Sequence, residues 1–189
     1  KQQYDKRIDI KSLTLYRVKQ PFSHPVKTAK GNVDERESFF VEVEDWAGRT
    51  GISECVSFAT NWYLPETIGE DYAVVRDSIA PVVLSERYLH PSEVSASLAT
   101  FPGLAKYPMA KAAVEPAIWD LYGKITGQPL AKLIGGSNAE KVLGGAVVGI
   151  APVEEVRAKV NALVAQGYTR VKMKIEPETA LECVAAVRA

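Results

Sequence analysis

Alternating hydrophobic and polar residues predict strands in the first third of the chain. Over Ile8 to Val18, apolar residues alternate with polar ones, with a change of phase near Ser12 that suggests a β-bulge. The alternation returns over Ser38 to Glu44, and a turn leads into a third short strand over about Thr50 to Cys55. Pro21 to Gly31 is rich in turn-forming residues, so we expect a loop there. Three neighbouring strands of this kind predict an antiparallel meander.

Helical spacing replaces the alternation further along the chain. Glu66 to Ile79 carries apolar residues at i, i+4, i+7 and i+11, which predicts an amphipathic helix that ends at Pro81. A shorter helix is expected over Pro91 to Leu98, and a longer one over Pro108 to Lys124. Pro116, inside the longer helix, is expected to kink it or to remove one backbone hydrogen bond.

The pattern changes again after residue 135. Val142 to Ile150 is an uninterrupted apolar run, which predicts a strand buried on both faces. An amphipathic helix that starts at Pro152 and stops before Gly167 leads to a second strand over Thr169 to Ile175. Strand, helix and strand in this order form a βαβ unit with a parallel sheet.

The final helix and the domain division follow from these patterns. A helix is expected from about Pro177, with Leu181 and Val184 in phase on its apolar side. We therefore predict an α+β domain over residues 1–135, with a three-stranded antiparallel meander plus helices. Residues 136–189 are predicted to open an α/β domain.

Charge and composition exclude several functional classes. The chain has 189 residues, with 23 Lys and Arg against 23 Asp and Glu, so it lacks the basic excess typical of nucleic-acid binders. No apolar run approaches the roughly 18–20 residues of a membrane span. Cys55 and Cys183 lie too far apart in sequence to suggest a zinc motif or a disulfide framework, and each is expected to be a buried small hydrophobe. We expect a soluble cytoplasmic protein with neither a nucleic-acid nor a membrane partner.

Lys172 and Lys174 are the sharpest candidates for chemistry. On a strand, residues two apart share a face, so both ammonium groups point together, opposite Val171 and Met173. In a parallel sheet covered on both faces, such a pair favours a neutral amine that acts as a base. The alternative is an edge strand whose lysines face water.

Several segments together resemble the enolase superfamily, in the muconate-cycloisomerase-like branch that contains o-succinylbenzoate synthases and N-succinylamino acid racemases. The resemblance covers nearly the whole chain in order. The segments that carry it are Pro25 to Gly31, Ser53 to Val56 with Phe58 to Tyr63, Ala112 to Leu121, Gly127 to Leu130 with Leu133 to Gly136, Gly145 to Ile150, and Lys172 to Lys174.

This resemblance implies a fold and a site. Residues 1–135 would be the capping domain, and residues 136–189 the first strands and helices of a (β/α) barrel, which needs about 250 residues when complete. Lys174 would be the acid/base that takes the α-proton of a carboxylate substrate, and Lys172 would assist it. Val26, Phe58 and Tyr63 would contact the substrate from two capping loops.

The resemblance also implies Mg²⁺ that stabilises an enediolate, with ligands on later barrel strands. No residue of this chain is therefore assigned to the metal, and the chain by itself is expected to be inactive. The expected reaction is the dehydration of o-succinylbenzoate synthase in menaquinone synthesis, or proton transfer on an N-acylamino acid. A dipeptide epimerase, a muconate cycloisomerase and a non-catalytic α+β binding or assembly module are the alternatives. The expected partners are a small-molecule carboxylate and further copies of the chain in a homo-oligomer.

Overall fold

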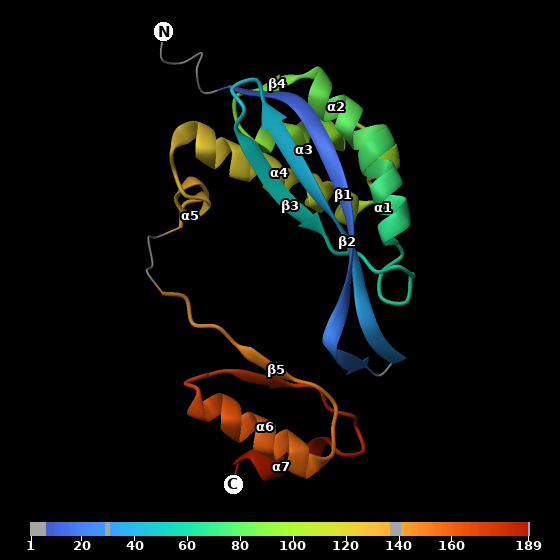
Figure 1. Ribbon diagram of the computed structural model, residues 1–189, viewed down its shortest axis with the longest axis vertical. Helices are drawn as coiled ribbons and strands as arrows, with labels where there is room; N and C mark the ends of the chain where they lie inside the picture. The colour runs from blue at the N-terminus through green and yellow to red at the C-terminus, as the bar shows by residue number, and fades with distance from the viewer. Residues whose placement is uncertain (1–6, 29–30, 137–140, 189) are drawn as a thin grey trace. The chain divides into compact units, whose positions relative to one another are not determined.

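Two compact units make up the chain, seen here in a computed structural model that describes residues 7–28, 31–136 and 141–188 (Figure 1). For residues 26–28 and 31 it describes the backbone alone. The capping unit comprises Lys1–Gln20 and Arg36–Asn138, and the βα unit comprises Pro21–Glu35 and Ala139–Ala189. The predicted boundary between residues 135 and 136 stays a prediction.

The capping unit is built on an antiparallel sheet of four strands in the order β3-β2-β1-β4. The strands are β1 (Ile8–Thr28), β2 (Gly31–Asp45), β3 (Thr50–Cys55) and β4 (Arg87–Tyr88). The predicted meander is therefore confirmed. The sequence pattern missed β4, because a strand of two residues is too short to show an alternation.

Alternation along the strands places the core on one face of this sheet. Phe39, Val41 and Val43 of β2 are fully buried. Ile8 and Leu13 of β1 belong to the same hydrophobic cluster although they are five positions apart, an odd step along the strand. The change of phase predicted near Ser12 accounts for this, since strict alternation would send them to opposite faces.

The prediction of a loop over Pro21 to Gly31 is wrong for most of that segment. The backbone remains in strand β1 as far as Thr28, and β2 begins at Gly31. A proline lacks only the N–H donor and is tolerated in a strand where that donor would not meet a partner strand. Pro21 and Pro25 are therefore compatible with the strand that the composition of the segment disfavoured.

A bent helix leads from the sheet to β4. It consists of α1 (Ile68–Val74), a π-helical turn (Val75–Ile79) and α2 (Ala80–Ser85). Pro81 does not end it as predicted, because the proline lies in the first turn of α2, where a missing N–H costs little. The π-helical turn before α2 is the place where the regular α-helical hydrogen-bond pattern is interrupted.

Further helical segments complete the capping unit, and the two longest of them lie behind the sheet in Figure 1. The segments are α3 (Ser92–Ala99), a 3₁₀ turn (Pro102–Leu104), α4 (Pro108–Thr126) and α5 (Leu130–Leu133). Helix α4 ends at Gly127, whose positive φ of 66° closes the helix in the left-handed conformation.

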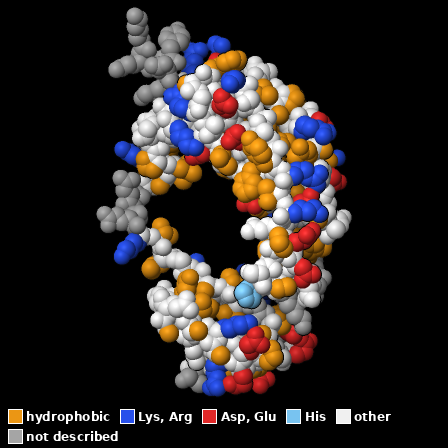
Figure 2. Space-filling view, viewed as in Figure 1, with side chains coloured by type: hydrophobic (Ala, Val, Ile, Leu, Met, Phe, Trp, Pro, Cys, Tyr) orange, Lys and Arg blue, Asp and Glu red, His pale blue; other side chains and the backbone are white. Residues whose placement is uncertain are grey.

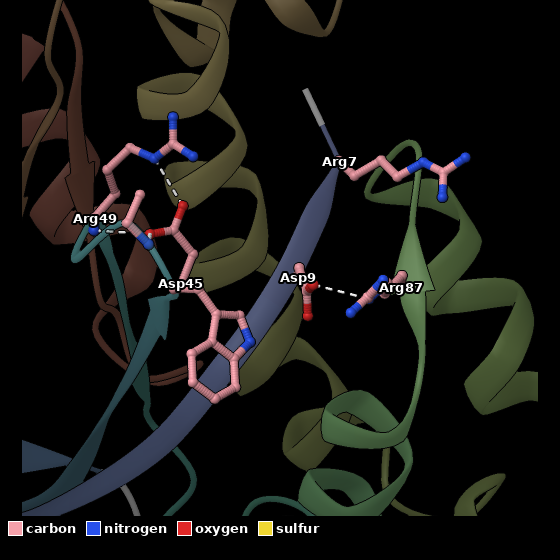
Figure 3. A pocket seen from close by; sticks show the side chains of 7 residues that line it. Arg7, Asp9, Asp45, Arg49 and Arg87 are labelled. Atoms are coloured by element: carbon pink, nitrogen blue, oxygen red, sulfur yellow. Dashed lines mark hydrogen bonds and ion pairs between the residues drawn. The ribbon is translucent and has the colours of Figure 1, made fainter. Parts of the chain in front are cut away.

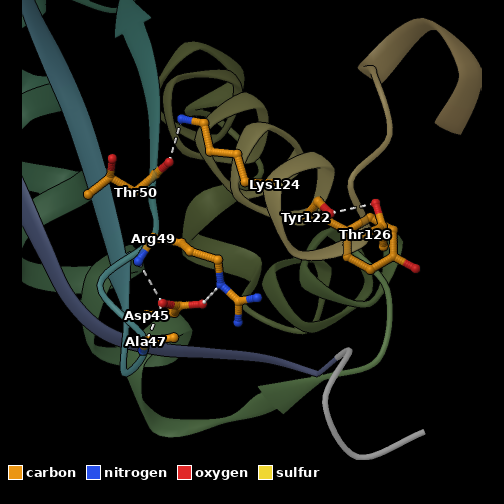
Figure 4. A network of polar contacts seen from close by, with 7 residues as sticks. All are labelled: Asp45, Ala47, Arg49, Thr50, Tyr122, Lys124 and Thr126. Atoms are coloured by element: carbon orange, nitrogen blue, oxygen red, sulfur yellow. Dashed lines mark hydrogen bonds and ion pairs between the residues drawn. The ribbon is translucent and has the colours of Figure 1, made fainter. Parts of the chain in front are cut away.

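Polar contacts order the turn before β3 and tie β3 to α4. Asp45 caps the turn, since its Oδ1 accepts hydrogen bonds from the Ala47 and Arg49 amides and its Oδ2 accepts one from Arg49 Nε, at 2.7 Å (Figure 4). Lys124 of α4 donates to the Thr50 carbonyl, at 2.5 Å. The Lys124 contact joins β3, an edge strand of the sheet, to the longest helix described in the unit.

The βα unit contains a parallel pair of strands, β5 (Ala146–Val148) and β6 (Val171–Met173), joined through α6 (Val153–Ala165). This is the predicted βαβ order, and a further helix, α7 (Ala180–Arg188), follows. Gly167, after α6, has the positive φ of 93° expected of a glycine at a helix end. The cluster that holds these elements together consists of Val148, Val156 and Val160, with Ala151, Leu163, Val171, Met173 and Val187 packed against it.

Two predictions for the βα unit are wrong. The run Val142 to Ile150 is not buried on both faces: Val142 is 87% exposed and Val147 is 61% exposed. The hydrophobic cluster with α6 lies on one face of the strand pair only. In α7, the exposed Leu181 and Val184 do not face the core, whereas the predicted small hydrophobe Cys183 is buried.

Candidate functional site

The two candidate lysines lie on the uncovered face of β6. Met173 packs into the hydrophobic cluster, whereas Lys172 before it and Lys174 after it in the sequence are exposed. The Lys174 amide donates a hydrogen bond of 2.9 Å to the Val148 carbonyl, so the ladder to β5 extends past the last residue of β6. The pair therefore shares a face, as the sequence predicted.

An apolar side chain lies beside the lysines on this face. Val147 of β5 is paired in register with Lys172. It is 61% exposed, although the next residue of the strand, Val148, is buried against α6. The face thus combines two cations with an exposed valine, in an arrangement suited to a carboxylate attached to a carbon skeleton.

The predicted aromatic contacts lie together in the capping unit. We call residues 57–66, between β3 and α1, the aromatic loop. The ring of Phe58 lies 4.7 Å from that of Trp62 and 5.9 Å from that of Tyr63, measured between centroids. Tyr63 is 66% exposed and Phe58 is half-buried, so the loop presents an aromatic surface anchored at Phe58.

Arg36 of β2 contacts the Phe58 ring of this aromatic cluster. Its guanidinium carbon lies 4.3 Å from the centre of the Phe58 ring, within cation–π range. The same guanidinium donates to the Val56 carbonyl, just before the aromatic loop. Arg36 therefore joins the residue that follows β3 to the first aromatic ring of the loop.

A buried polar cluster lies where the two ends of the aromatic loop meet. Ser57 donates a hydrogen bond to Oδ2 of Asp71, and the Cys55 thiol lies 3.3 Å from the Ser57 hydroxyl. Glu66, at the other end of the loop, accepts hydrogen bonds from the amides of Met109 and Ala110, at 2.9 and 3.4 Å. All of these side-chain groups are buried.

The environment of Asp71 changes its ionisation. Burial, which disfavours the charged form, raises the pKa of Asp71 to about 7. The Ser57 hydrogen bond lowers the pKa, whereas the neighbouring Glu66 carboxylate raises it. Oδ1 of Asp71 has no hydrogen-bond partner. Burial likewise raises the pKa of the Cys55 thiol.

Sequence reasoning missed Ser57, Glu66 and Asp71. One signal was present: Asp71 is three residues after Ile68 and four before Val75, so it lies on the apolar side of the predicted helix. An acidic residue on that side indicates a buried polar contact. Ser57 and Glu66 carried no comparable signal, because loop residues have no period that predicts which of them are buried.

Val26, the third predicted substrate contact, is not tested, because its side chain lies outside what the structure describes. Phe58 and Tyr63 belong to the capping unit, and Lys172 and Lys174 to the βα unit. Within each unit, the two candidates are neighbours.

A cavity of about 420 Å³ near the β2–β3 turn contains none of these candidates (Figure 3). Its cations are matched by acidic groups: Arg49 pairs with Asp45 at 2.7 Å and Arg87 with Asp9 at 2.8 Å. Trp46 also lines it. The face in Figure 2 likewise shows basic and acidic side chains interspersed, in keeping with the balanced composition.

The sequence matches the family described as mandelate racemase / muconate lactonizing enzyme, N-terminal domain, over residues 11–135. The chain belongs to this family. Its four-stranded sheet with helices is the capping fold of the enolase superfamily, and the resemblance inferred from the sequence is confirmed.

Two relatives and one solved structure represent what this family member is similar to. It is 38% identical to an o-succinylbenzoate synthase of Bacillus subtilis, over 96% of this chain and 48% of the relative. It is 34% identical to an N-succinylamino acid racemase of Thermus thermophilus, over 75% of this chain and 37% of the relative. A crystal structure of a member of the enolase superfamily from Enterococcus faecalis matches with a TM-score of 0.85 and 32% identity, over 96% of this chain and 48% of that chain.

The family member spans about half the length of the curated relatives it matches. In the part that the structure describes, no three His, Cys, Asp or Glu side chains converge to hold a metal ion. None of the described helices is both long and apolar enough to cross a bilayer.

Proposed function

We propose that this chain is the capping domain and the first βα units of an enzyme that removes the α-proton of a carboxylate substrate. The reaction we assign to the whole protein is that of an o-succinylbenzoate synthase, with racemase activity on N-succinylamino acids. The synthase and the racemase among its relatives support both reactions, since each is more than 30% identical to this chain.

The observation that carries the proposal is that Lys172 and Lys174 share one face of the strand pair, beside Val147. Lys174 is assigned as the base that takes the proton by resemblance to the enolase superfamily, and a hydrogen bond from its amide to the Val148 carbonyl holds its backbone. Lys172 supplies a second positive charge on the same face, which would attract the substrate carboxylate and the negative charge that forms on proton removal.

The aromatic loop supplies the substrate contacts in this proposal. Phe58 and Tyr63 present flat apolar surface, with Phe58 supported by Arg36. Rings of this kind exclude water and contact the succinyl or side-chain group of the substrate. They do not contact the carbon from which the proton is removed. The loop thus sets specificity, and the lysines carry the proton transfer.

Mg²⁺ enters only as the cofactor that the superfamily resemblance implies. The described residues offer no converging set of acidic or imidazole ligands. They do not fit a magnesium site, so none of them is proposed as a metal ligand.

The test is α-proton exchange in deuterated water with an N-succinylamino acid, using the whole protein to which this sequence belongs, with Mg²⁺ added. Lys174→Ala should lower the exchange rate by about 10²- to 10⁴-fold. The matched control is Lys159→Ala, which removes an exposed lysine paired with Glu155 at 2.6 Å and should leave the rate unchanged.

The rival, a non-catalytic module with a solvated lysine pair, is favoured by the same exposure of Lys172 and Lys174. It predicts no exchange in the unmodified protein, or equal exchange before and after Lys174→Ala. A parallel assay measures the dehydration that o-succinylbenzoate synthase carries out, with a cyclohexadiene carboxylate as substrate. Comparing the two assays separates synthase from racemase activity.

A further inference from the structure

The first residue of the aromatic loop is tied to a buried carboxyl group on α1, the helix that follows the end of the loop. Ser57, the first residue of the loop, donates its hydroxyl hydrogen to Asp71. Glu66, the last residue, is buried as well and is held by the amides of Met109 and Ala110. Across the loop, the Ile68 amide donates a hydrogen bond of 2.8 Å to the Phe58 carbonyl. Asp71 thus lies where the chain leaves β3 and where it enters α1.

The two carboxyl groups have different surroundings. Glu66 accepts the amide hydrogens of Met109 and Ala110 at the start of α4, where no side chain of Tyr107 caps the helix. A helix N-terminus favours a negatively charged partner. Asp71 is fully buried and accepts one hydroxyl hydrogen, while its Oδ1 is left without a partner. The proton of the pair therefore belongs on Asp71.

We propose that Asp71 is a positioning residue: in its protonated form it ties the start of the aromatic loop, through Ser57, to helix α1 at the end of the loop and thereby fixes the location of Phe58 and Tyr63. The proposal rests on the proposed function only in taking these rings as substrate contacts. The anchoring itself is a property of the capping unit.

Ionisation of Asp71 would weaken this anchor. The titratable groups that act on it are Cys55 from β3, Glu66 from the loop end and Glu70 from its own helix. None of these carries a positive charge, so a charged Asp71 would face a second carboxylate without compensation. Protonation of Asp71 removes this repulsion.

The sign of the pH effect follows from the raised pKa of Asp71. When the loop opens, water reaches the carboxyl group and its pKa returns toward the usual value of about 3.8. Opening therefore releases a proton between that value and about 7. Protection of the loop should fall as the pH rises through this window, by up to about tenfold per pH unit, and level off above it.

The experiment is amide hydrogen exchange over residues 57–68 of the 189-residue chain, from about pH 5 to about pH 8, with rates corrected for intrinsic exchange. The unmodified chain should lose protection as the pH rises toward 7. Asp71→Asn, which keeps an acceptor for Ser57 and adds a permanent donor, should stay protected without a pH dependence. Asp71→Ala should lose protection at every pH.

The matched control is Asp77→Asn, which alters an exposed aspartate in the same bent helix, paired with Arg76 at 2.6 Å. It should keep the pH dependence of the unmodified chain. The proposal is overturned if loop protection does not change with pH, or if Asp71→Asn retains the slope. Because this assay needs no turnover, its outcome is separate from that of the α-proton exchange test.

A second readout separates positioning from plain stability in the whole protein. Asp71→Ala should raise KM for the N-succinylamino acid while the rate at saturation changes less, because the rings and not the base are displaced. Asp71→Asn should restore KM at all pH values. A KM unchanged in Asp71→Ala, with the loop unprotected, would contradict the link between the anchor and substrate binding.

Discussion

Gly51 of β3 faces the backbone of Ala117 in α4 so closely that a Cβ at Gly51 would lie 2.0 Å from the Ala117 carbonyl oxygen. The same Cβ would lie 2.6 Å from the Leu121 amide nitrogen. No side chain fits between the strand and the helix at this point. The residue is therefore fixed by packing, and its φ is not in the left-handed region.

Replacing this glycine should destabilise the capping unit. Gly51→Ala forces β3 away from α4 and should lower the free energy of unfolding by about 1–3 kcal/mol, as measured by urea denaturation. The matched control is Gly69→Ala in α1, where a Cβ would meet no atom within 4 Å. That change should stabilise the chain by about 0.5–1 kcal/mol, because alanine favours a helix more than glycine does. Equal effects at the two positions would contradict the packing argument.

Stability should depend on pH through Asp71. Because the pKa of Asp71 is raised in the folded chain to about 7 from about 3.8, the folded state binds the proton more tightly than the unfolded state. Stability from this group is greatest at low pH and falls as the pH rises from about 4 to about 7. Asp71→Asn should remove this slope, and thermal unfolding followed at a series of pH values measures it.

Asp77 supplies a control of opposite sign. Its hydrogen bond with Arg76 lowers the pKa of this exposed carboxyl group. Its stabilising contribution is therefore present above the usual pKa of aspartate and is lost as the pH falls through the lowered value. Asp77→Asn should leave the slope between pH 4 and 7 in place, so a slope lost in both variants would remove the assignment to Asp71.

The order of elements was predictable from the sequence because most are amphipathic with a clear period. Phe39, Val41 and Val43 alternate along β2 and are buried as that alternation implies. The prediction failed where local composition and tertiary pairing disagree. Pro21 and Pro25 favour a loop by composition, yet pairing between β1 and β2 keeps the segment extended.

The candidate site was predictable only in part. The spacing of Lys172 and Lys174 predicted their shared face, because two residues along a strand span one full repeat. The joint role of Ser57, Glu66 and Asp71 depends on contacts between the start of a loop, its end and a helix, and no local pattern encodes such contacts. Phe58 and Tyr63 were identified through the family resemblance and not through a physical pattern in the loop.

The side chains of α7 that pack against the core differ from those expected from the sequence, and this difference can be tested. By spacing, Leu181 is expected to face the core, but it is 87% exposed, whereas Val187 packs into the cluster of the βα unit. Val187→Ala should therefore lower the free energy of unfolding of this unit by about 1 kcal/mol, from the loss of buried methyl groups. Leu181→Ala should change it by less than about 0.5 kcal/mol. Denaturation followed by exchange of α6 and α7 amides compares the two, and the reverse order would restore the phase expected from the sequence.

Tyr63 tests whether the aromatic loop contacts substrate. Its ring is 66% exposed, so Tyr63→Ala should change the free energy of unfolding by less than about 0.5 kcal/mol. If the ring packs on substrate equally before and during proton transfer, KM for the N-succinylamino acid should rise by roughly tenfold, or about 1.4 kcal/mol, with little change in kcat.

Trp46 is the matched control for Tyr63, because it is an aromatic residue 71% exposed at the β2–β3 turn, outside the aromatic loop. Trp46→Ala should leave KM and kcat unchanged. A KM that responds equally to both substitutions would mean that the effect comes from general loss of surface aromatics. An unchanged KM in Tyr63→Ala would remove Tyr63 from the substrate contacts and leave Phe58, the ring that Arg36 holds, as the contact that the loop supplies.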